Sequence, residues 1–265
     1  MSAISNLAVV GKKARIADGV EIGPFAIIED DVEIAAGVKI WPHAHICSGS
    51  SIGEGTEVHM GAVVGHLPQD LAFKDRKTYL KIGKRNTIRE YATIHRGTAE
   101  GSSTVIGDDC YFMAASHVGH NCRIGNNVIV ANGALLAGYV TVGDSAFISG
   151  NVVIHQFCRI GALSIIGGFS GVNKDVPPYM LVRGPSVVRG VNLVGLRRAK
   201  FSRELMNDIK EAYKFLYQSG LNTAQAIEEI KKLKPSKELN HLVEFIQGSK
   251  RGICKYKNSD TDFFE

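Results

Sequence analysis

Every sixth residue from Ile4 to Val64 is aliphatic, and this unbroken run constrains the fold more than any other feature of the chain. The period resumes at Ile82 and runs again from Ile106 to Val172. A period of six is neither that of a helix nor that of a simple strand alternation. It is typical of hexapeptide repeats, in which three short strands close one triangular coil and each coil buries its aliphatic side chains against the next.

A second inward position reinforces this pattern, because the residue four places after each aliphatic is small or β-branched, as at Val20, Ala26 and Val32. The sequence therefore predicts a mainly β fold: a left-handed parallel β-helix, a triangular prism of roughly nine coils. The left hand is a property of the repeat class and is not visible in the sequence. A β-sandwich is the alternative, but its strands recur at about 8–12 residues with uneven turns.

The hexads define the expected domains. The prism should span residues 1–178, with two polar loops near 65–81 and 95–105 where the period breaks. Loops on a rigid scaffold often carry function. A linker over 179–201 should lead into a small α-helical C-terminal domain over 202–265. Its helices are expected to begin at Ser202, at Asn222 or Thr223, and at Ser236, and to end near Gln218, Leu233 and Gln247.

Composition excludes several classes of protein. The chain has 265 residues, 45% of them apolar, which is enough for a large core. No apolar run reaches membrane-spanning length, and the N-terminus lacks the features of a secretory signal. We therefore expect a cytoplasmic protein without stable membrane insertion.

The net charge of +5 lies entirely in the C-terminal part. From Arg189 onward there are 15 Lys and Arg against 10 Asp and Glu, so residues 1–188 carry 16 of each sign. A solvated helical face explains this excess, and so does a docking surface for an acidic protein or a phosphate-bearing partner. No nucleic-acid-binding motif is visible, so we expect no nucleic-acid partner.

The five cysteines do not indicate a metal or disulfide site. Cys110, Cys122 and Cys158 each lie four places after a hexad aliphatic, which makes them small buried side chains. Cys47 and Cys254 show no ligand-like spacing. The cysteines therefore give no reason to expect a metal site, and we expect no cofactor.

One coil is three hexads, so positions three hexads apart stack on one face wherever the register is unbroken. This places His120 beneath Gly138 and Gly138 beneath Gln156, with His117 and His155 in nearby columns. A histidine pointing outward can act as a general base near neutral pH. Gly138 has no side chain, so its backbone N–H can approach an oxyanion, as acyl transfer requires.

Two other functions remain open at this stage. Prism-shaped carbonic anhydrases of the γ type hold zinc with three histidines, although His117, His120 and His155 lack the spacing of those ligands. A noncatalytic solenoid scaffold is the third interpretation.

Specific motifs outside the hexads make the chain resemble the UDP-N-acetylglucosamine acyltransferases that begin lipid A synthesis. They are Pro68-Gln69-Asp70-Leu71, Ile94-His95-Arg96-Gly97-Thr98, His117-Val118-Gly119-His120-Asn121-Cys122, His155-Gln156-Phe157-Cys158, Asp175-Val176-Pro177-Pro178-Tyr179, Gly190-Val191-Asn192 and Gly195-Leu196-Arg197-Arg198. The resemblance covers nearly the whole chain.

The resemblance implies a homotrimer that moves an (R)-3-hydroxyacyl chain from acyl carrier protein to the 3-position of UDP-N-acetylglucosamine, with sites between adjacent prisms and without metal. His120 would be the base and Gly138 the oxyanion donor. The basic C-terminal part would suit the acidic carrier protein. The positions that match substrate-binding residues are Asp70, His117, His155, Gln156, Asn192 and Arg198, and Gly168 matches an acyl-chain ruler.

The chain also departs from the family pattern. Asn121 stands where an aspartate often follows the catalytic histidine, and Tyr139 stands where many members have a histidine. Val194 and Ala199 replace a glutamate and an arginine near the nucleotide, and Ser186 occupies a second ruler position. Acyl length, and a 3-hydroxyl or 3-amino acceptor, stay open. A sister enzyme that acts on an acylated glucosamine lipid precursor is the nearest rival.

Overall fold

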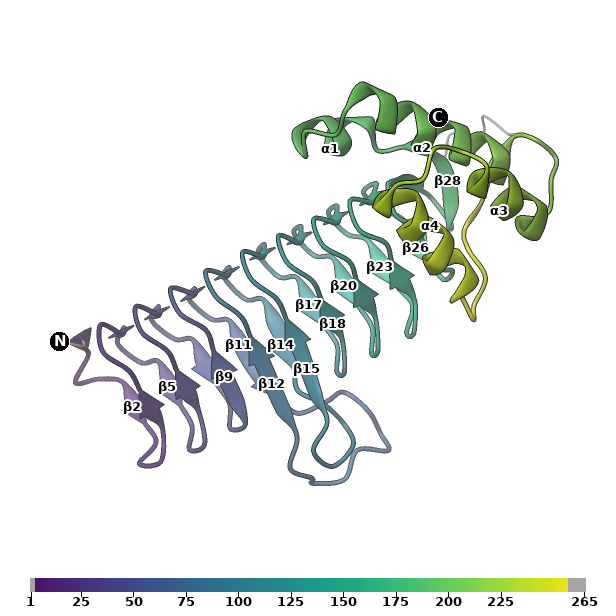
Figure 1. Ribbon diagram of the computed structural model, residues 1–265. Coiled ribbons are helices and arrows are strands. Elements are labelled where there is room, and N and C mark those ends of the chain that lie inside the picture. Colours follow the sequence, from purple (N-terminus) through teal and green to yellow (C-terminus); the bar gives the residue numbers. More distant parts are fainter. Residues whose placement is uncertain (1–2, 257–265) are drawn as a thin grey trace, which may run out of the picture.

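Three parallel sheets form the faces of a prism in the computed structural model, which describes residues 3–256 (Figure 1). Sheet A contains β1 (Ala3–Ile4), β4 (Glu21–Ile22), β7 (Lys39–Ile40), β10 (Glu57–Val58), β13 (Thr87–Ile88), β16 (Tyr111–Phe112), β19 (Ile129–Val130), β22 (Phe147–Ile148), β25 (Ile165–Ile166), β27 (Met180–Arg183), β28 (Val187–Val191) and β29 (Lys255–Tyr256). Sheet B contains β2 (Val9–Val10), β5 (Ile27–Ile28), β8 (His45–Ile46), β11 (Val63–His66), β14 (Thr93–His95), β17 (His117–Val118), β20 (Leu135–Leu136), β23 (Val153–Ile154) and β26 (Gly171–Val172). Sheet C contains β3 (Arg15–Ile16), β6 (Glu33–Ile34), β9 (Ser50–Ile52), β12 (Tyr79–Ile82), β15 (Ser103–Ile106), β18 (Arg123–Ile124), β21 (Thr141–Val142) and β24 (Arg159–Ile160).

The strand register confirms the predicted coil. Val118 pairs with Leu136, which pairs with Ile154, so each of these steps along sheet B advances the chain by three hexads. From Ile22 onward the hexad aliphatics point inward and are buried, and so is the second register of small residues, among them Val20 and Ala44. In the first coil, which has a neighbour on one side only, Ile4 is exposed and Val10 and Ile16 are partly buried. Sheet B has nine strands, in agreement with the predicted number of coils.

Both predicted loops leave the prism at the edge between sheets B and C (Figure 1). The first connects β11 to β12 and the second connects β14 to β15. They are held together, since the N–H of Tyr79 donates to the carbonyl of Ser102 at 2.9 Å and that of Gly101 donates to the carbonyl of Lys77 at 2.9 Å. The loops therefore form one projecting unit beside the middle coils.

The range 179–201, expected to be a linker, contains β27, β28 and the short helix α1 (Leu193–Arg198). Pro177 and Pro178 lack an N–H, and sheet C ends with a single bridge between Ile160 and Val176. The chain then returns to sheet A, where β27 pairs with β25 through a shortened coil, as Ile166 pairs with Val182 and not with the residue three hexads on. β28 pairs antiparallel with β27, and so the sheet continues past the prolines.

Three further helices cover the C-terminal end of the prism: α2 (Arg203–Tyr217), α3 (Thr223–Lys231) and α4 (Lys237–Gln247) (Figure 1). Their N-caps are Ser202, Asn222 and Ser236, as the sequence predicts, and Asn222 forms a full capping box with Gln225. No helix within residues 3–256 is long and apolar enough to cross a bilayer.

The cysteines of the inward register are buried and unpaired, which confirms their structural assignment. Burial raises the pKa of the Cys110 thiol to about 11 and that of Cys122 to about 12, so both stay protonated at neutral pH.

Candidate functional site

His120 and Gly138 lie directly against each other at the edge between sheets B and C. A Cβ atom at position 138 would come within 2.5 Å of His120 Nε2, so only glycine leaves room for the imidazole in this position. The backbone N–H of Gly138 donates no hydrogen bond within the described part of the chain. The next N–H, that of Tyr139, donates to the His120 carbonyl at 2.9 Å. A base and an unused backbone donor therefore lie side by side, as the three-hexad spacing predicts.

Asn121 orients the His120 ring. The backbone N–H and the hydroxyl of Thr98 lie 3.1 Å and 2.8 Å from Asn121 Oδ1, and His120 Nδ1 lies 3.0 Å from the same oxygen. Because a backbone N–H can only donate, that amide atom is an acceptor, and His120 Nδ1 must carry the proton. The lone pair is then on Nε2, the nitrogen beside Gly138.

A row of further histidines continues from His117 along sheet B towards β11. The rings of His95 and His117 meet edge to face at 4.8 Å, and those of His66 and His95 lie 6.1 Å apart. Burial, with the neighbouring histidines, lowers the pKa of His95 to about 4, and burial also lowers the pKa of His117. Thr93 Oγ1 hydrogen-bonds His117 Nδ1 at 2.8 Å. His95 and His117 are therefore mostly neutral and can offer hydrogen bonds without adding charge.

Two aromatic side chains stack beside His120 on its C-terminal side. The ring of Tyr139 meets His120 edge to face, with ring centroids 5.3 Å apart, and stacks on Phe157 at 4.8 Å. The Tyr139 hydroxyl lies 3.0 Å from the Thr98 hydroxyl, so a hydrogen bond connects the second loop to this aromatic pair.

His155 and Gln156 are exposed at the same edge, one coil beyond Gly138. His155 Nδ1 lies 3.1 Å from the Gln156 carbonyl oxygen and 3.4 Å from Arg251 Nη2, away from the other histidines. Among residues 3–256, potential metal ligands converge in a group of three only at Glu29, His45 and Cys47. The three histidines of the zinc hypothesis therefore do not form a metal-binding group within one chain.

Asp70 lies in the first loop, on the same edge as His120 but nearer the N-terminus. Its carboxylate Oδ1 accepts the N–H of Ala72 at 2.9 Å, which shapes the loop. This bond is local to the loop, so the carboxylate is held on the projecting unit and not by the histidine row.

The remaining predicted residues lie on other edges of the prism. Gly168 is exposed at the corner between β25 and β26, where sheet A meets sheet B. Asn192 caps α1 and donates through Nδ2 to the Leu163 carbonyl at 2.8 Å, at the corner between sheets C and A. Arg198 is exposed at the end of α1. One chain therefore does not bring them to His120.

Residue spacing did not identify three features. The roles of His95 and Thr98 near His120 do not follow from spacing, because the two loops beside them interrupt the three-hexad register. Both residues belong to a motif of the sequence, but the motif does not give their position. The group of Glu29, His45 and Cys47 corrects the expectation that Cys47 shows no ligand-like spacing. Its signal was present, because Glu29 and Cys47 are three hexads apart.

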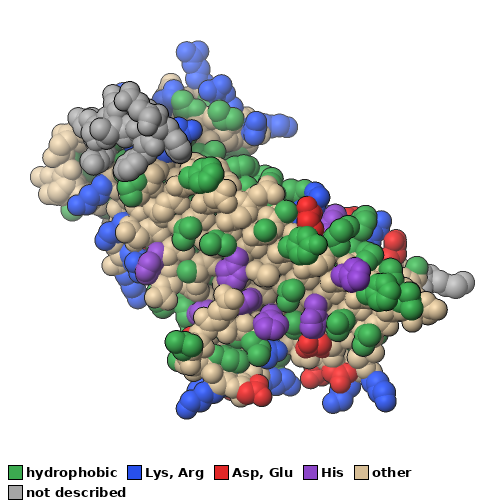
Figure 2. Space-filling view, turned by 180° about the vertical axis from the view of Figure 1, so that it is seen from behind, with side chains coloured by type: hydrophobic (Ala, Val, Ile, Leu, Met, Phe, Trp, Pro, Cys, Tyr) green, Lys and Arg blue, Asp and Glu red, His purple; other side chains and the backbone are tan. Residues whose placement is uncertain are grey.

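Sheet B is the least charged face. Figure 2 shows histidine side chains gathered on one face of the prism with hydrophobic side chains around them. Along sheet C the outward positions include Arg15, Glu33, Lys81, Arg123 and Arg159. Along sheet B none of the outward strand positions in the described chain is Lys, Arg, Asp or Glu; they are Val9, Ile27, His45, Val63, Thr93, His117, Leu135, Val153 and Gly171.

Comparison with known sequences places these features in context. The family described as Udp N-acetylglucosamine O-acyltransferase, domain 2, matches residues 175–254, and bacterial transferase hexapeptide (six repeats) matches residues 31–66 and 103–138. A relative from Thermodesulfovibrio yellowstonii, named as an acyl-(acyl-carrier-protein)–UDP-N-acetylglucosamine O-acyltransferase, is 47% identical over 96% of this chain and 100% of the relative. One of the same name from Halorhodospira halophila is 45% identical over the same shares.

Solved structures agree with the sequence comparison. A UDP-N-acetylglucosamine acyltransferase from Bacteroides fragilis superposes with a TM-score of 0.90 at 42% identity, covering 94% of this chain and 99% of that one. One from Moraxella catarrhalis gives 0.92 at 36% identity, over 95% and 99%. The chain has the parallel β-helix fold predicted from its hexads, with the left hand expected of this repeat class.

Proposed function

The chain belongs to the UDP-N-acetylglucosamine O-acyltransferase family, and from this premise we propose that it moves an (R)-3-hydroxyacyl chain from acyl carrier protein to the 3-position of UDP-N-acetylglucosamine. This is the first step of lipid A biosynthesis. The observation that supports it most directly is the contact between His120 and Gly138.

His120 Nε2 is the general base. The Asn121 amide holds the proton on Nδ1, so the Nε2 lone pair is available to the attacking sugar oxygen. As that oxygen bonds to the thioester carbonyl carbon, its proton passes to Nε2. When the tetrahedral intermediate collapses, the carbon–sulfur bond breaks and the imidazolium returns the proton to the leaving thiolate.

Gly138 stabilises the charge of that intermediate. Its N–H donates to the oxyanion that develops on the former thioester carbonyl, in the space that a side chain would otherwise fill. Removal of one such donor typically lowers kcat by about 10²–10³-fold. The base and the donor belong to the chain, and the reaction we propose uses no metal or cofactor.

Asp70 and His117 would bind the sugar from the same edge. His155 and Gln156, with Asn192 and Arg198, would bind the nucleotide, the phosphates or the acyl donor, and Gly168 would set the acyl length. These residues are divided among three edges of one prism, and Asn192 already uses its amide as a helix cap. We therefore propose a homotrimer in which neighbouring prisms bring the edges together.

The uncharged outward column of sheet B supports such an assembly, because this face can be covered without burying unpaired charges. Next to it, Phe25, Trp41 and Tyr91 are exposed on the chain's corners. Aromatic side chains of this kind are enriched at interfaces.

The acyl donor would dock beside α1. Arg197, Arg198, Lys200 and Arg203 are exposed in and after this helix, and such a cluster complements an acidic carrier protein and accelerates its association. We propose that the reaction takes place in the cytoplasm, where unpaired cysteines such as those of this chain stay reduced.

The test is acyl transfer by purified protein supplied with a mixture of acyl-carrier-protein thioesters and UDP-N-acetylglucosamine or its 3-amino analogue, with products identified by mass spectrometry. His120→Gln should lower turnover by at least about 10²-fold, the size of a typical general-base contribution. Gly138→Ala should also be strongly impaired.

His241→Gln is the matched control, because His241 is exposed on α4 far along the chain from the site. It should keep full activity. Near-normal turnover of His120→Gln would refute the mechanism, and failure of the native protein to acylate either sugar would refute the substrate assignment.

A further inference from the structure

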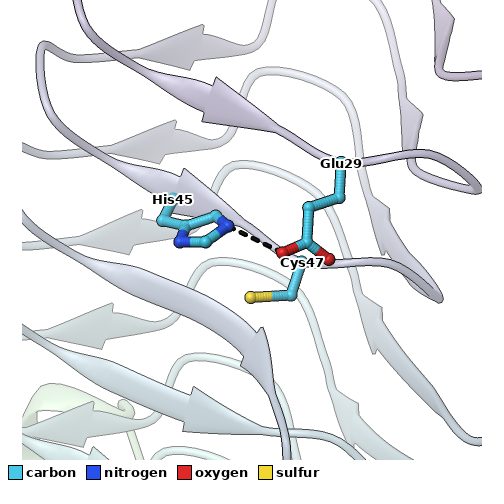
Figure 3. Close-up of side chains that lie close together, drawn as sticks. All are labelled: Glu29, His45 and Cys47. Carbon is cyan, nitrogen blue, oxygen red and sulfur yellow. Dashed lines mark hydrogen bonds and ion pairs between the residues drawn. The ribbon is translucent and has the colours of Figure 1, made fainter. Parts of the chain in front are cut away.

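Glu29, His45 and Cys47 meet on the outer side of sheet B (Figure 3), where β8 lies one strand before β11, the strand that carries His66 of the histidine row. Glu29 follows β5, and His45 and Cys47 flank the inward Ile46 of β8. The nearest ligand atoms of the three side chains all lie within 4.8 Å of one another. His45 and His117 are three strand steps apart, which is about 14 Å at the usual strand separation. The group therefore lies apart from His117 and His120, which are next to the proposed reaction.

Each side chain is already oriented towards the others. Glu29 Oε2 accepts the N–H of Ser48 at 2.8 Å, which fixes the carboxylate and leaves Oε1 facing His45. His45 Nε2 lies 2.9 Å from that oxygen. Bonds of about 2.0–2.1 Å to a tetrahedral ion put two such ligand atoms roughly 3.3 Å apart, so this pair needs to open by only a few tenths of an ångström.

The chemistry of the donors selects the kind of ion. One thiol, one imidazole and one carboxylate are ligands typical of zinc, and soft sulfur disfavours magnesium and calcium. Three protein ligands leave a fourth position open, and within one chain Glu29 and His45 are only partly buried there. We propose that Glu29, His45 and Cys47 form a binding site for Zn²⁺ or a similar transition-metal ion, which links two successive strands of sheet B.

The charges around the site act both for and against ion binding. Two anions, the Glu29 carboxylate and a Cys47 thiolate, neutralise a divalent ion beside a neutral imidazole. Burial and the charge of Glu29 raise the pKa of the Cys47 thiol to about 12, while Arg96 lowers it. Binding therefore replaces the S–H bond with a sulfur–metal bond and releases that proton to solvent. The ion must also displace the hydrogen bond between His45 and Glu29 and tolerate the Arg96 guanidinium, which is held by the Ser48 carbonyl.

The simpler interpretation is that these side chains only form a structural hydrogen bond, and metal titration separates the two. Full-length protein is treated with chelator and titrated with Co²⁺ alone, because a cobalt–thiolate bond gives a near-ultraviolet charge-transfer band that the cysteine-free histidine row cannot produce. We expect one equivalent per chain. Cys47→Ser should abolish the band, and His45→Ala and Glu29→Gln should each weaken binding by at least about 10-fold.

Cys110→Ser is the matched control, since Cys110 is buried and belongs to no group of three potential ligands in the described chain, and it should keep the band. Zn²⁺ should displace Co²⁺ and raise the melting temperature of the native protein but not of Cys47→Ser. Absence of a cobalt–thiolate band, or a band that survives Cys47→Ser, would overturn the proposal. Neither result depends on whether the protein transfers acyl groups.

Discussion

At the residue scale, Asn121 fixes the His120 tautomer with a neutral group. Its amide oxygen is held by Thr98 and accepts the Nδ1 proton, so a carboxylate is not required for orientation. A carboxylate at this place would add a charge that stabilises the imidazolium, the form that cannot act as a base.

Asn121→Asp should therefore favour the imidazolium form of His120 and move the acid limb of the kcat/KM profile to higher pH, by about one unit. The measurement is the pH dependence of acyl transfer for both proteins. Asn127→Asp is the control, because Asn127 occupies another corner with the same positive φ and is exposed on a different edge. An unchanged or lowered acid limb in Asn121→Asp would contradict the assignment of His120 as the base.

His95 makes the fold sensitive to acid. Burial lowers the pKa of its imidazole to about 4 in the folded chain, against roughly 6.5 when unfolded. The unfolded chain therefore takes up a proton first as the pH falls. The contribution of neutral His95 to the free energy of unfolding is therefore fully present above about pH 6.5, and it is lost as the pH falls towards 4.

Between pH 6.5 and 5 this loss should be about 1–2 kcal/mol. We expect His95→Gln, which cannot titrate, to lose that much less than the native protein over this interval. Urea unfolding at several pH values and one protein concentration measures it. If the free energy of unfolding fell equally with pH in both proteins, protonation of His95 would not destabilise the fold, and the prediction would be wrong.

At the element scale, the coil depends on its inward residues, and Phe112 is the only aromatic member of the hexad series. It is fully buried in sheet A. Phe112→Ala should destabilise the protein by about 3–5 kcal/mol because a cavity remains, and Phe112→Leu by much less. Chemical unfolding measures both. Phe169→Ala, at an exposed corner, should stay within about 0.5 kcal/mol, and an equal loss there would contradict this account.

The same elements show why sequence reasoning succeeded for the coils and failed elsewhere. The inward side chain recurs at every sixth position because each strand must bury one, so stacking of His120 on Gly138 follows from counting. The loops carry no such period. Their contact with the site depends on bonds such as Thr98 to Asn121, which pattern alone does not encode.

The continuation past Pro178 was hidden for a related reason. Prolines stop a ladder, but the chain needs only a slightly shortened coil to rejoin sheet A as β27. A fixed period of three hexads does not reveal a coil of another length.

At the scale of the whole molecule, the faces of the prism differ in how readily a neighbouring prism can cover them. Sheet C presents a row of charged side chains, whereas the outward strand positions of sheet B are apolar, histidine, threonine or glycine. Covering sheet C would desolvate charges, which costs several kcal/mol for each charge left unpaired. The proposed trimer should therefore use sheet B.

Ile27→Lys tests this preference, because Ile27 is an outward, half-exposed residue of sheet B. A lysine here would put an unpaired charge into each of the three interfaces of a trimer, so the variant should dissociate and lose acyl transfer together. Thr141→Lys adds the same charge to exposed sheet C and should leave both unchanged. Analytical ultracentrifugation gives the assembly state, and circular dichroism shows whether the coils stay folded. Dissociation by Thr141→Lys alone would place the interface on sheet C, and a monomeric variant with full activity would show that one prism holds a complete site.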